Sequence, residues 1–255
     1  MAGRAREVLK KVDTIAGYST YLVLINDLIK DKKIISTAMT KEVDRVEMAI
    51  NEALYKTPCA LVSGGDPGIY AMAGLVFEIC KKKNIKLIRG GSQTYKRGGN
   101  DVNQTLGENS LCLEIVPGIP ALAAGAALTG APLTHDFAAI SLSNLLTPWE
   151  KIEKRLEFAA MADFSIVIYN PKSKKRDWQL RRAREIILKH RKKDTPVSII
   201  TGAMRENQNI EITKLSDIDE KNIGMQSILF IGSSTSMKYL DFMFTPRGYG
   251  QKYNF

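Results

Sequence analysis

The sequence predicts an α/β protein in which mainly parallel or mixed sheets are flanked by helices. Short apolar runs typical of buried strands alternate along the chain with segments whose apolar residues recur at helical spacing. One of these strands, 59–62, leads through a glycine-rich turn into a helix, which is the order in which α/β proteins bring ligands to backbone amides. The length of 255 residues is sufficient for two such domains.

The first half contains elements of both kinds. Apolar residues three and four positions apart predict helices that begin near residue 5, 43 and 69, and small apolar residues favour a helix over 121–128. Strands are expected over 59–62, 85–88 and 111–116. Between the last two, residues 89–110 are polar and glycine-rich without an apolar period, which predicts a long loop.

A domain boundary is expected at Gly130-Ala131-Pro132, which divides the chain into 1–132 and 133–255. Beyond it the pattern predicts helices over 148–161 and 178–190. Strands are predicted over 138–142, 164–169, 197–201 and 227–231.

Composition indicates a soluble cytoplasmic protein without a structural metal. The least polar run, 121–133, is shorter than the ~18 residues that a membrane helix needs. The cysteines, Cys59, Cys80 and Cys112, lack a C-x-x-C spacing, and two of them fall in apolar runs, which favours buried free thiols. The two histidines, His135 and His190, are far apart in sequence and do not form a metal-binding motif.

The net charge of +10 is concentrated in one window, because residues 172–193 alone carry +9. Such a cluster can be a solvated helix face, a nucleic-acid patch or an attractor for a polyanionic small molecule. Base stacking needs several aromatic rings, and Trp178 is the single ring in this window. We therefore expect no nucleic-acid partner.

The glycine-rich turn Ser63-Gly64-Gly65-Asp66-Pro67-Gly68 is not a phosphate loop, because its glycines and its lack of a lysine do not fit the nucleotide motifs. The Asp66 carboxylate at the tip suits a ligand with hydroxyls or an ammonium group. The alternative is that the turn is simply a tight connection.

Together with this turn, three further segments resemble the tetrapyrrole methylase family: Pro117–Ala121, Ile168–Ser173 and Thr245–Tyr249. The stretch from His135 to Trp149 is similar to the branch that methylates C17 of precorrin-3B or of cobalt-precorrin-3 (cobalt-factor III), with ring contraction, in cobalamin biosynthesis. The resemblance implies an S-adenosylmethionine-dependent C-methyltransferase with two α/β domains, a tetrapyrrole substrate, no membrane partner and a homodimeric assembly.

The resemblance also implies site residues. Cofactor contacts are expected at Gly64, Gly65, Asp66, Ile69, Pro120, Ala121, Tyr169, Asn170 and Ala203. His135 beside Asp136 is the expected acid/base for ring contraction, since an imidazole transfers protons near neutrality; the alternative is a structural histidine. Arg205, Arg247 and Lys172 are expected to bind the ionised carboxylates of the macrocycle.

The family normally opens with a strand and a G-x-G-P-G loop, whereas Met1-Ala2-Gly3 leads directly into the first helix. We expect either that the opening strand is absent from this protein or that the sequence starts after it. Two alternatives remain open: an rRNA methyltransferase of the same superfamily, and a non-catalytic binding protein on the same fold.

Overall fold

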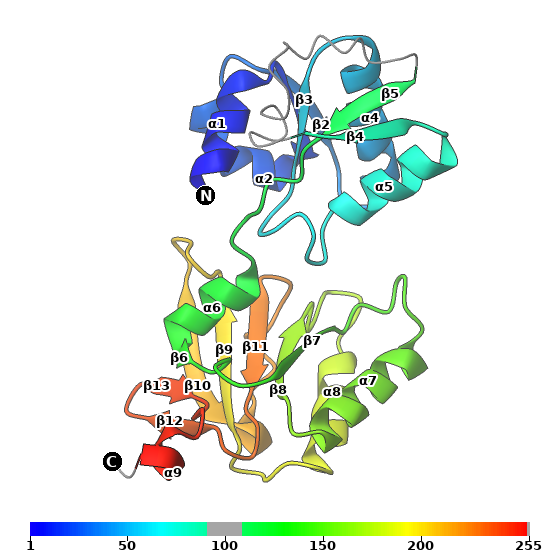
Figure 1. The fold of residues 1–255 in the computed structure, drawn as a ribbon. Coiled ribbons are helices and arrows are strands. Elements are labelled where there is room, and N and C mark those ends of the chain that lie inside the picture. Colours follow the sequence, from blue (N-terminus) through cyan, green and yellow to red (C-terminus); the bar gives the residue numbers. More distant parts are fainter. Residues whose placement is uncertain (91–108, 254–255) are drawn as a thin grey trace. The chain divides into compact units, whose positions relative to one another are not determined.

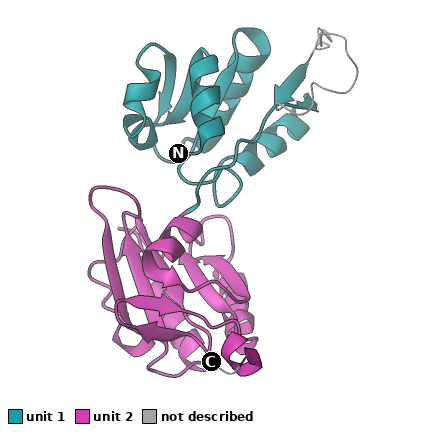
Figure 2. Cartoon of the chain, turned by 60° about the vertical axis from the view of Figure 1, so that its left-hand side comes forward, with its two compact units in different colours: residues 1–120 teal, residues 121–255 magenta. Residues whose placement is uncertain are grey.

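The computed structural model describes residues 1–90 and 109–253, which form two compact units, Met1–Pro120 and Ala121–Phe255 (Figure 2). The loop predicted over 89–110 lies almost entirely outside the described residues. The boundary between the units follows residue 120, twelve residues before the expected boundary at 132. The reason is that the helix over 121–129 packs on the sheet of the second unit. Within the described ranges, no helix has the length and apolar character needed to cross a bilayer.

The first unit has a three-stranded parallel sheet and a separate pair of parallel strands (Figure 1). The sheet has the order β2-β1-β3, and the pair consists of β4 and β5. The elements of this unit are α1 (Gly3–Lys11), β1 (Thr14–Tyr18), α2 (Ser19–Val23), α3 (Asn26–Ile29), β2 (Lys33–Thr37), α4 (Glu42–Tyr55), β3 (Cys59–Val62), α5 (Ala73–Lys82), β4 (Lys86–Arg89) and β5 (Ser110–Leu113).

The central strand β1 separates two small cores. Ile15 packs with Leu9 of α1 and Ile29 of α3 on one face, whereas its neighbour Ala16 packs with Ala49 of α4 on the other. Successive strand residues point to opposite faces, so both faces of β1 are covered by helices. A third cluster joins α4 and α5 to the β4–β5 pair.

The second unit is built on a mixed five-stranded sheet of order β10-β9-β11-β8-β7. Strands β7 and β8 are parallel, and β11 runs antiparallel to both β8 and β9, so β7, β8 and β9 point the same way. The elements are α6 (Ala121–Thr129), β6 (Gly130–Ala131), β7 (Phe137–Ser141), α7 (Trp149–Met161), β8 (Ser165–Tyr169), α8 (Gln179–Leu188), β9 (Pro196–Thr201), β10 (Asn209–Lys214), β11 (Ser227–Ile231), β12 (Met237–Tyr239), β13 (Phe242–Phe244) and α9 (Tyr249–Tyr253).

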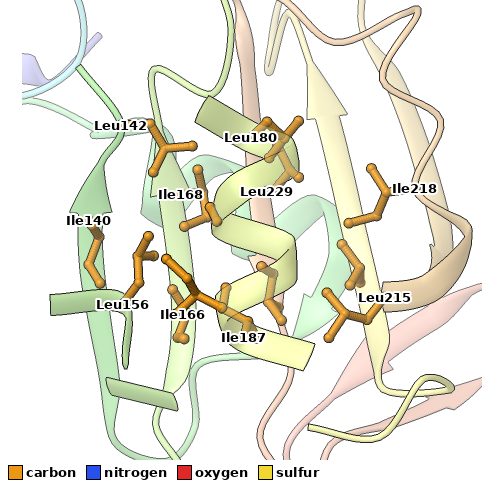
Figure 3. Packing of buried hydrophobic residues seen from close by; sticks show 14 of the residues in the cluster. Ile140, Leu142, Leu156, Ile166, Ile168, Leu180, Ile187, Leu215, Ile218 and Leu229 are labelled. Carbon is orange, nitrogen blue, oxygen red and sulfur yellow. The ribbon is translucent and has the colours of Figure 1, made fainter. Parts of the chain in front are cut away.

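The main core of this unit lies between the sheet and helices α7 and α8. Figure 3 shows Leu180 and Ile187 of α8 among strand residues such as Ile168 and Leu229. The alternate residues of the same strands, among them Val167 and Phe230, belong to a second cluster with α6 on the opposite face. The predicted class, helices on both faces of mixed or parallel sheets, is confirmed.

Candidate functional site

The glycine-rich turn of the first unit follows β3, at the carboxyl edge of the parallel sheet. Asp66 is the centre of its hydrogen bonds: Oδ1 accepts from the Gly68 N–H at 2.8 Å, and Oδ2 accepts from the Gly118 N–H at 2.9 Å. Gly118 belongs to the segment that follows β5. The carboxylate therefore joins the two segments that leave β3 and β5.

The same two segments touch through their backbones. A Cβ on Gly118 would lie 2.0 Å from the Gly65 carbonyl oxygen, far inside the distance that real contacts allow. Gly65 itself has φ 73°, a left-handed conformation that favours glycine. Glycine is thus required at position 118 by close approach and favoured at position 65 by conformation.

Gly64 and Gly65 are exposed, whereas Asp66 and Ile69 are half-buried. Beneath Gly64 lies Tyr21, whose Cε1 would be 3.0 Å from an added Cβ. Tyr21 also makes an edge-to-face contact with Tyr18, with ring centroids 5.5 Å apart. The result is an exposed backbone surface, free of side chains and supported by an aromatic ring, against which a flat ligand can lie.

In the second unit, the carboxyl ends of β7, β8 and β9 lie at one edge of the sheet, because these three strands point the same way. The Tyr169 hydroxyl accepts a hydrogen bond from the Leu122 N–H at 2.9 Å, which ties the end of β8 to the start of α6. Asn170 Nδ2 donates to Ser141 Oγ at 2.9 Å, which ties β8 to the end of β7. Asn170 has φ 50° and is held in the left-handed region.

The loop after β9 completes this edge. Gly202 has φ 61°, and its N–H donates to the Gln226 carbonyl at 3.0 Å. Ala203 and Arg205 follow, and both are half-buried. The structure thus places Ala121, Tyr169, Asn170, Ala203 and Arg205 at one edge of the second unit.

His135, Asp136 and Arg247 are not at this edge. His135 and Asp136 directly precede β7, so the length of that strand, about 15 Å for five residues, separates them from Ser141 and Asn170. The Arg247 guanidinium donates to the Thr134 carbonyl at 3.1 Å, which places Arg247 at the same opposite edge. His135 is half exposed, and its Nδ1 accepts from the Asp136 N–H at 2.8 Å, a local turn contact. The expected acid/base pair and one expected substrate arginine are therefore separated from Asn170, because β7 and β8 run parallel, so residues before β7 and residues after β8 lie at opposite edges.

Of the eleven cations in the basic window 172–193, six are exposed and five contact other parts of the protein. Lys172 donates to the Glu220 carbonyl at 2.9 Å, and Arg184 donates to the Ile218 carbonyl at 3.2 Å. Arg182 pairs with Glu153 at 2.6 Å. Burial lowers the pKa of the Arg176 and Arg191 guanidinium groups, which donate to backbone carbonyls. Lys172 also lines a surface groove of about 360 Å³. The other residues that line it are Ile218 and six charged residues of both signs: Asp177, Arg181, Arg184, Asp219, Glu220 and Lys221.

Sequence reasoning missed three residues that shape these edges: Tyr21 under Gly64, Ser141 beside Asn170, and Arg176. Tyr21 and Ser141 carry no motif of their own, and their contacts join segments far apart in sequence. Arg176 belongs to the basic window, and composition does not show which cations of that window are buried.

Known proteins that are similar to this chain are methylases of one family. A family model described as Tetrapyrrole (Corrin/Porphyrin) Methylases matches residues 95–219. The chain is 43% identical to the cobalt-factor III methyltransferase of Priestia megaterium over 98% of its own length, but it spans 43% of that longer protein. It is 38% identical to the probable cobalt-factor III C(17)-methyltransferase of Salmonella typhimurium, covering 98% of this chain and 93% of the relative.

A crystal structure of the methyltransferase CobJ superposes with a TM-score of 0.82 at 29% identity, over 96% of this chain and 93% of that one. With relatives of this identity covered almost end to end, the chain belongs to the tetrapyrrole methylase family.

Proposed function

We propose that this protein transfers a methyl group from S-adenosylmethionine to C17 of cobalt-factor III, or of the related precorrin-3B, in cobalamin biosynthesis. The names of the Priestia and Salmonella relatives support this substrate. The observation that carries the proposal is the exposed Gly64-Gly65 backbone, which Asp66 fixes by accepting one N–H from its own turn and one from Gly118.

The residues present fit the proposed methyl donor. Each Asp66 oxygen accepts one backbone hydrogen bond and retains a lone pair that can receive a hydroxyl or ammonium proton. Ala121 and Ala203 are small, half-buried residues that leave room for a flat ring. Bound S-adenosylmethionine would supply an activated methyl on sulfur, and the chain's part is to hold it in line and exclude water, which is worth about 7–11 kcal/mol.

Methylation of an electron-rich macrocycle carbon needs no general base. The proposal accordingly gives His135 and Asp136 no role in methyl transfer. For the carboxylates of the macrocycle we propose Arg205 and, secondarily, Lys172, because both lie beside the carboxyl ends of strands in the second unit. Arg247 is dropped from this role, since it lies at the opposite edge.

The basic window gives the rRNA alternative only part of its charge. Four of its five arginines, Arg176, Arg182, Arg184 and Arg191, are engaged within the protein, whereas six of its eleven cations are exposed. Salt dependence separates the two functions, because nucleic-acid binding driven by phosphate contacts weakens steeply with salt.

We further propose that the protein acts in the cytoplasm as a homodimer. The three cysteines are free, as expected in a reducing compartment, and the dimer rests on the family resemblance. Light scattering on the purified protein tests the dimer, since it should give twice the mass of one chain.

The donor site is tested by calorimetry with S-adenosylmethionine. Asp66→Asn keeps the size of the side chain but removes one acceptor, so the dissociation constant should rise at least about tenfold. Asp219→Asn is the matched control, because Asp219 Oδ1 also accepts from its own turn, at Lys221 N, without joining a second segment. Equal affinities in wild type and Asp66→Asn would refute the site.

The reaction is tested with cobalt-factor III and a donor that carries a ¹³C methyl group. Carbon NMR of the product should place the label at C17. Absence of transfer together with donor binding would favour a non-catalytic binding protein.

A further inference from the structure

Arg176 lies at the Asn170 edge of the second unit and is 7% exposed. Its Nη1 donates to the Asn170 carbonyl at 2.9 Å and to the Leu142 carbonyl at 3.3 Å, and its Nη2 lies 3.4 Å from Met225 Sδ. Within the described ranges no carboxylate pairs with it: burial alone perturbs its pKa, which it lowers. Arg176 is thus a buried cation held by backbone carbonyls.

Burying a guanidinium without a counter-charge costs free energy, and arginine remains protonated in proteins. The carbonyl dipoles offset part of this cost. The two carbonyls belong to the two segments that leave parallel strands β7 and β8, so one side chain joins both chain segments at the edge where the donor contacts are proposed.

Asn170 is held from two sides as a result. Its carbonyl is held by Arg176, and its Nδ2 donates to Ser141 Oγ at 2.9 Å. The residue has φ 50°, a conformation that costs free energy for a non-glycine residue and persists where its surroundings fix it. Without Arg176, the Ser141 bond alone would hold Asn170 in place.

We infer that Arg176 is a positioning residue for the methyl donor: it fixes Asn170 in its left-handed conformation and thereby sets the donor affinity. The inference rests on the proposed function. Arg176 acts through Asn170 and its neighbours.

The same unit provides a control in Arg191, whose side chain is 3% exposed and, unlike that of Arg176, pairs with a carboxylate, that of Asp163 at 3.2 Å. Arg191 also donates to backbone carbonyls, those of Ala160, Phe164 and Gly232. Ala160 and Phe164 precede β8, so Arg191 lies at the edge opposite Asn170. Loss of either arginine should destabilise the unit, but only the loss of Arg176 should affect the donor.

The experiment measures S-adenosylmethionine affinity by calorimetry and thermal stability for Arg176→Met and Arg191→Met in the full chain. Both variants should lower the melting temperature. Arg176→Met should raise the dissociation constant at least about tenfold, and Arg191→Met should change it less than about twofold. Equal weakening in the two variants, or none in Arg176→Met, overturns the inference. If Arg176→Met does not fold, Arg176→Lys replaces it, with the same criterion relative to Arg191→Lys.

A double-mutant cycle separates positioning from general stability. Glycine adopts a positive φ without strain, so Asn170→Gly removes the need for Arg176 to hold this conformation. In that background, Arg176→Met should change donor affinity by less than about threefold. A full tenfold effect would show that Arg176 does not act through Asn170.

Hydrogen exchange without ligand distinguishes failure of this inference from failure of the proposed function. Arg176→Met should speed amide exchange in 141–144 and 170–176 at least about tenfold relative to Arg191→Met. If the wild type does not bind S-adenosylmethionine, the proposed function fails, and the exchange result alone decides whether Arg176 fixes this edge. Unchanged exchange in those segments overturns the inference whatever the donor does.

Discussion

A single carboxylate and a single glycine determine the geometry of the first-unit loop. Asp66 accepts hydrogen bonds from two segments, and Gly118 allows their backbones to touch at the Gly65 carbonyl. The sequence suggested that Asp66 faces a ligand. The structure adds that Asp66 also fixes the loop, so a substitution there removes a ligand partner and loosens the surface that would bind it.

Gly118→Ala should therefore separate the two segments. The new Cβ would meet the Gly65 carbonyl at 2.0 Å, and overpacking against backbone typically costs about 1–3 kcal/mol. We expect a lower free energy of unfolding by that amount and donor affinity reduced at least about tenfold.

Gly74→Ala is the control for this substitution. Gly74 lies in α5, and an added Cβ there would meet nothing within 4 Å. Because alanine favours a helix over glycine by up to about 1 kcal/mol, this variant should be neutral or more stable. Urea unfolding and calorimetry check both variants, and an equally stable Gly118→Ala with unchanged affinity would contradict the close approach.

At the scale of elements, Glu52 in the last turn of α4 ties the amino ends of the first-unit strands. Its carboxylate, 5% exposed, accepts from Thr14 at the start of β1 at 3.2 Å and from Lys33 at the start of β2 at 2.8 Å. Thr57, two residues before β3, donates to it at 3.2 Å. The hydrogen bond from Lys33 is the main cause that lowers the pKa of Glu52, against the effect of burial.

The lowered pKa predicts how stability depends on pH. Below the unfolded-state value of about 4.3, the unfolded chain binds a proton that the folded chain still excludes, so stability is lost as pH falls through the folded pKa. Glu52→Gln should be less stable at pH 7 but lose less stability between about pH 5 and pH 3. Urea unfolding across this range tests the prediction. Glu47→Gln, in the same helix with its carboxylate 39% exposed, is the control. A Glu52→Gln curve parallel to that of the wild type would contradict it.

The elements that the sequence predicted are those with an apolar period. Helices α4, α5, α7 and α8 and strands β3, β8 and β11 form within a few residues of their expected positions. Strands β1 and β2 were missed. Thr14-Ile15-Ala16-Gly17 is buried on both faces, and its small residues show no alternation, while a Cβ on Gly17 would lie 2.8 Å from Leu22.

The sequence predicted which segments contribute to the site, but not which of their residues lie close together in the folded protein. Motif residues such as Asp66 and Asn170 lie at strand carboxyl ends, as the strand-turn-helix order implied. The sequence predicted a strand after His135 and another before Asn170, but it did not reveal that these two strands are neighbours and parallel, which puts the two residues at opposite edges. Arg176 appeared to be one of many surface cations, since burial depends on packing between β7, β8 and α8 that charge patterning does not record.

For the whole molecule, the buried apolar residues are unevenly divided. The largest cluster of the second unit contains nineteen buried residues between the sheet and α7–α8 (Figure 3). Among its described residues, the first unit has three smaller clusters, the largest with seven buried residues. Its β4–β5 sheet consists of two strands, and a sheet of this size is only marginally stable on its own. We therefore expect the first unit to unfold at lower denaturant concentration.

The tryptophans make this expectation measurable. Both tryptophans of the chain, Trp149 and Trp178, lie in the second unit with ring centroids 4.8 Å apart, so tryptophan fluorescence reports on that unit alone. Far-ultraviolet circular dichroism reports on helices of both units. In a urea titration, circular dichroism should begin to change at lower urea than fluorescence does, because two-state coincidence of the probes fails when the units unfold separately. Hydrogen exchange should agree, with amides of β8 and β11 slower than those of β4 and β5 by at least about tenfold. Superimposable transitions from both probes, with equal protection in the two sheets, would mean that the first unit is as stable as the second despite its smaller cores.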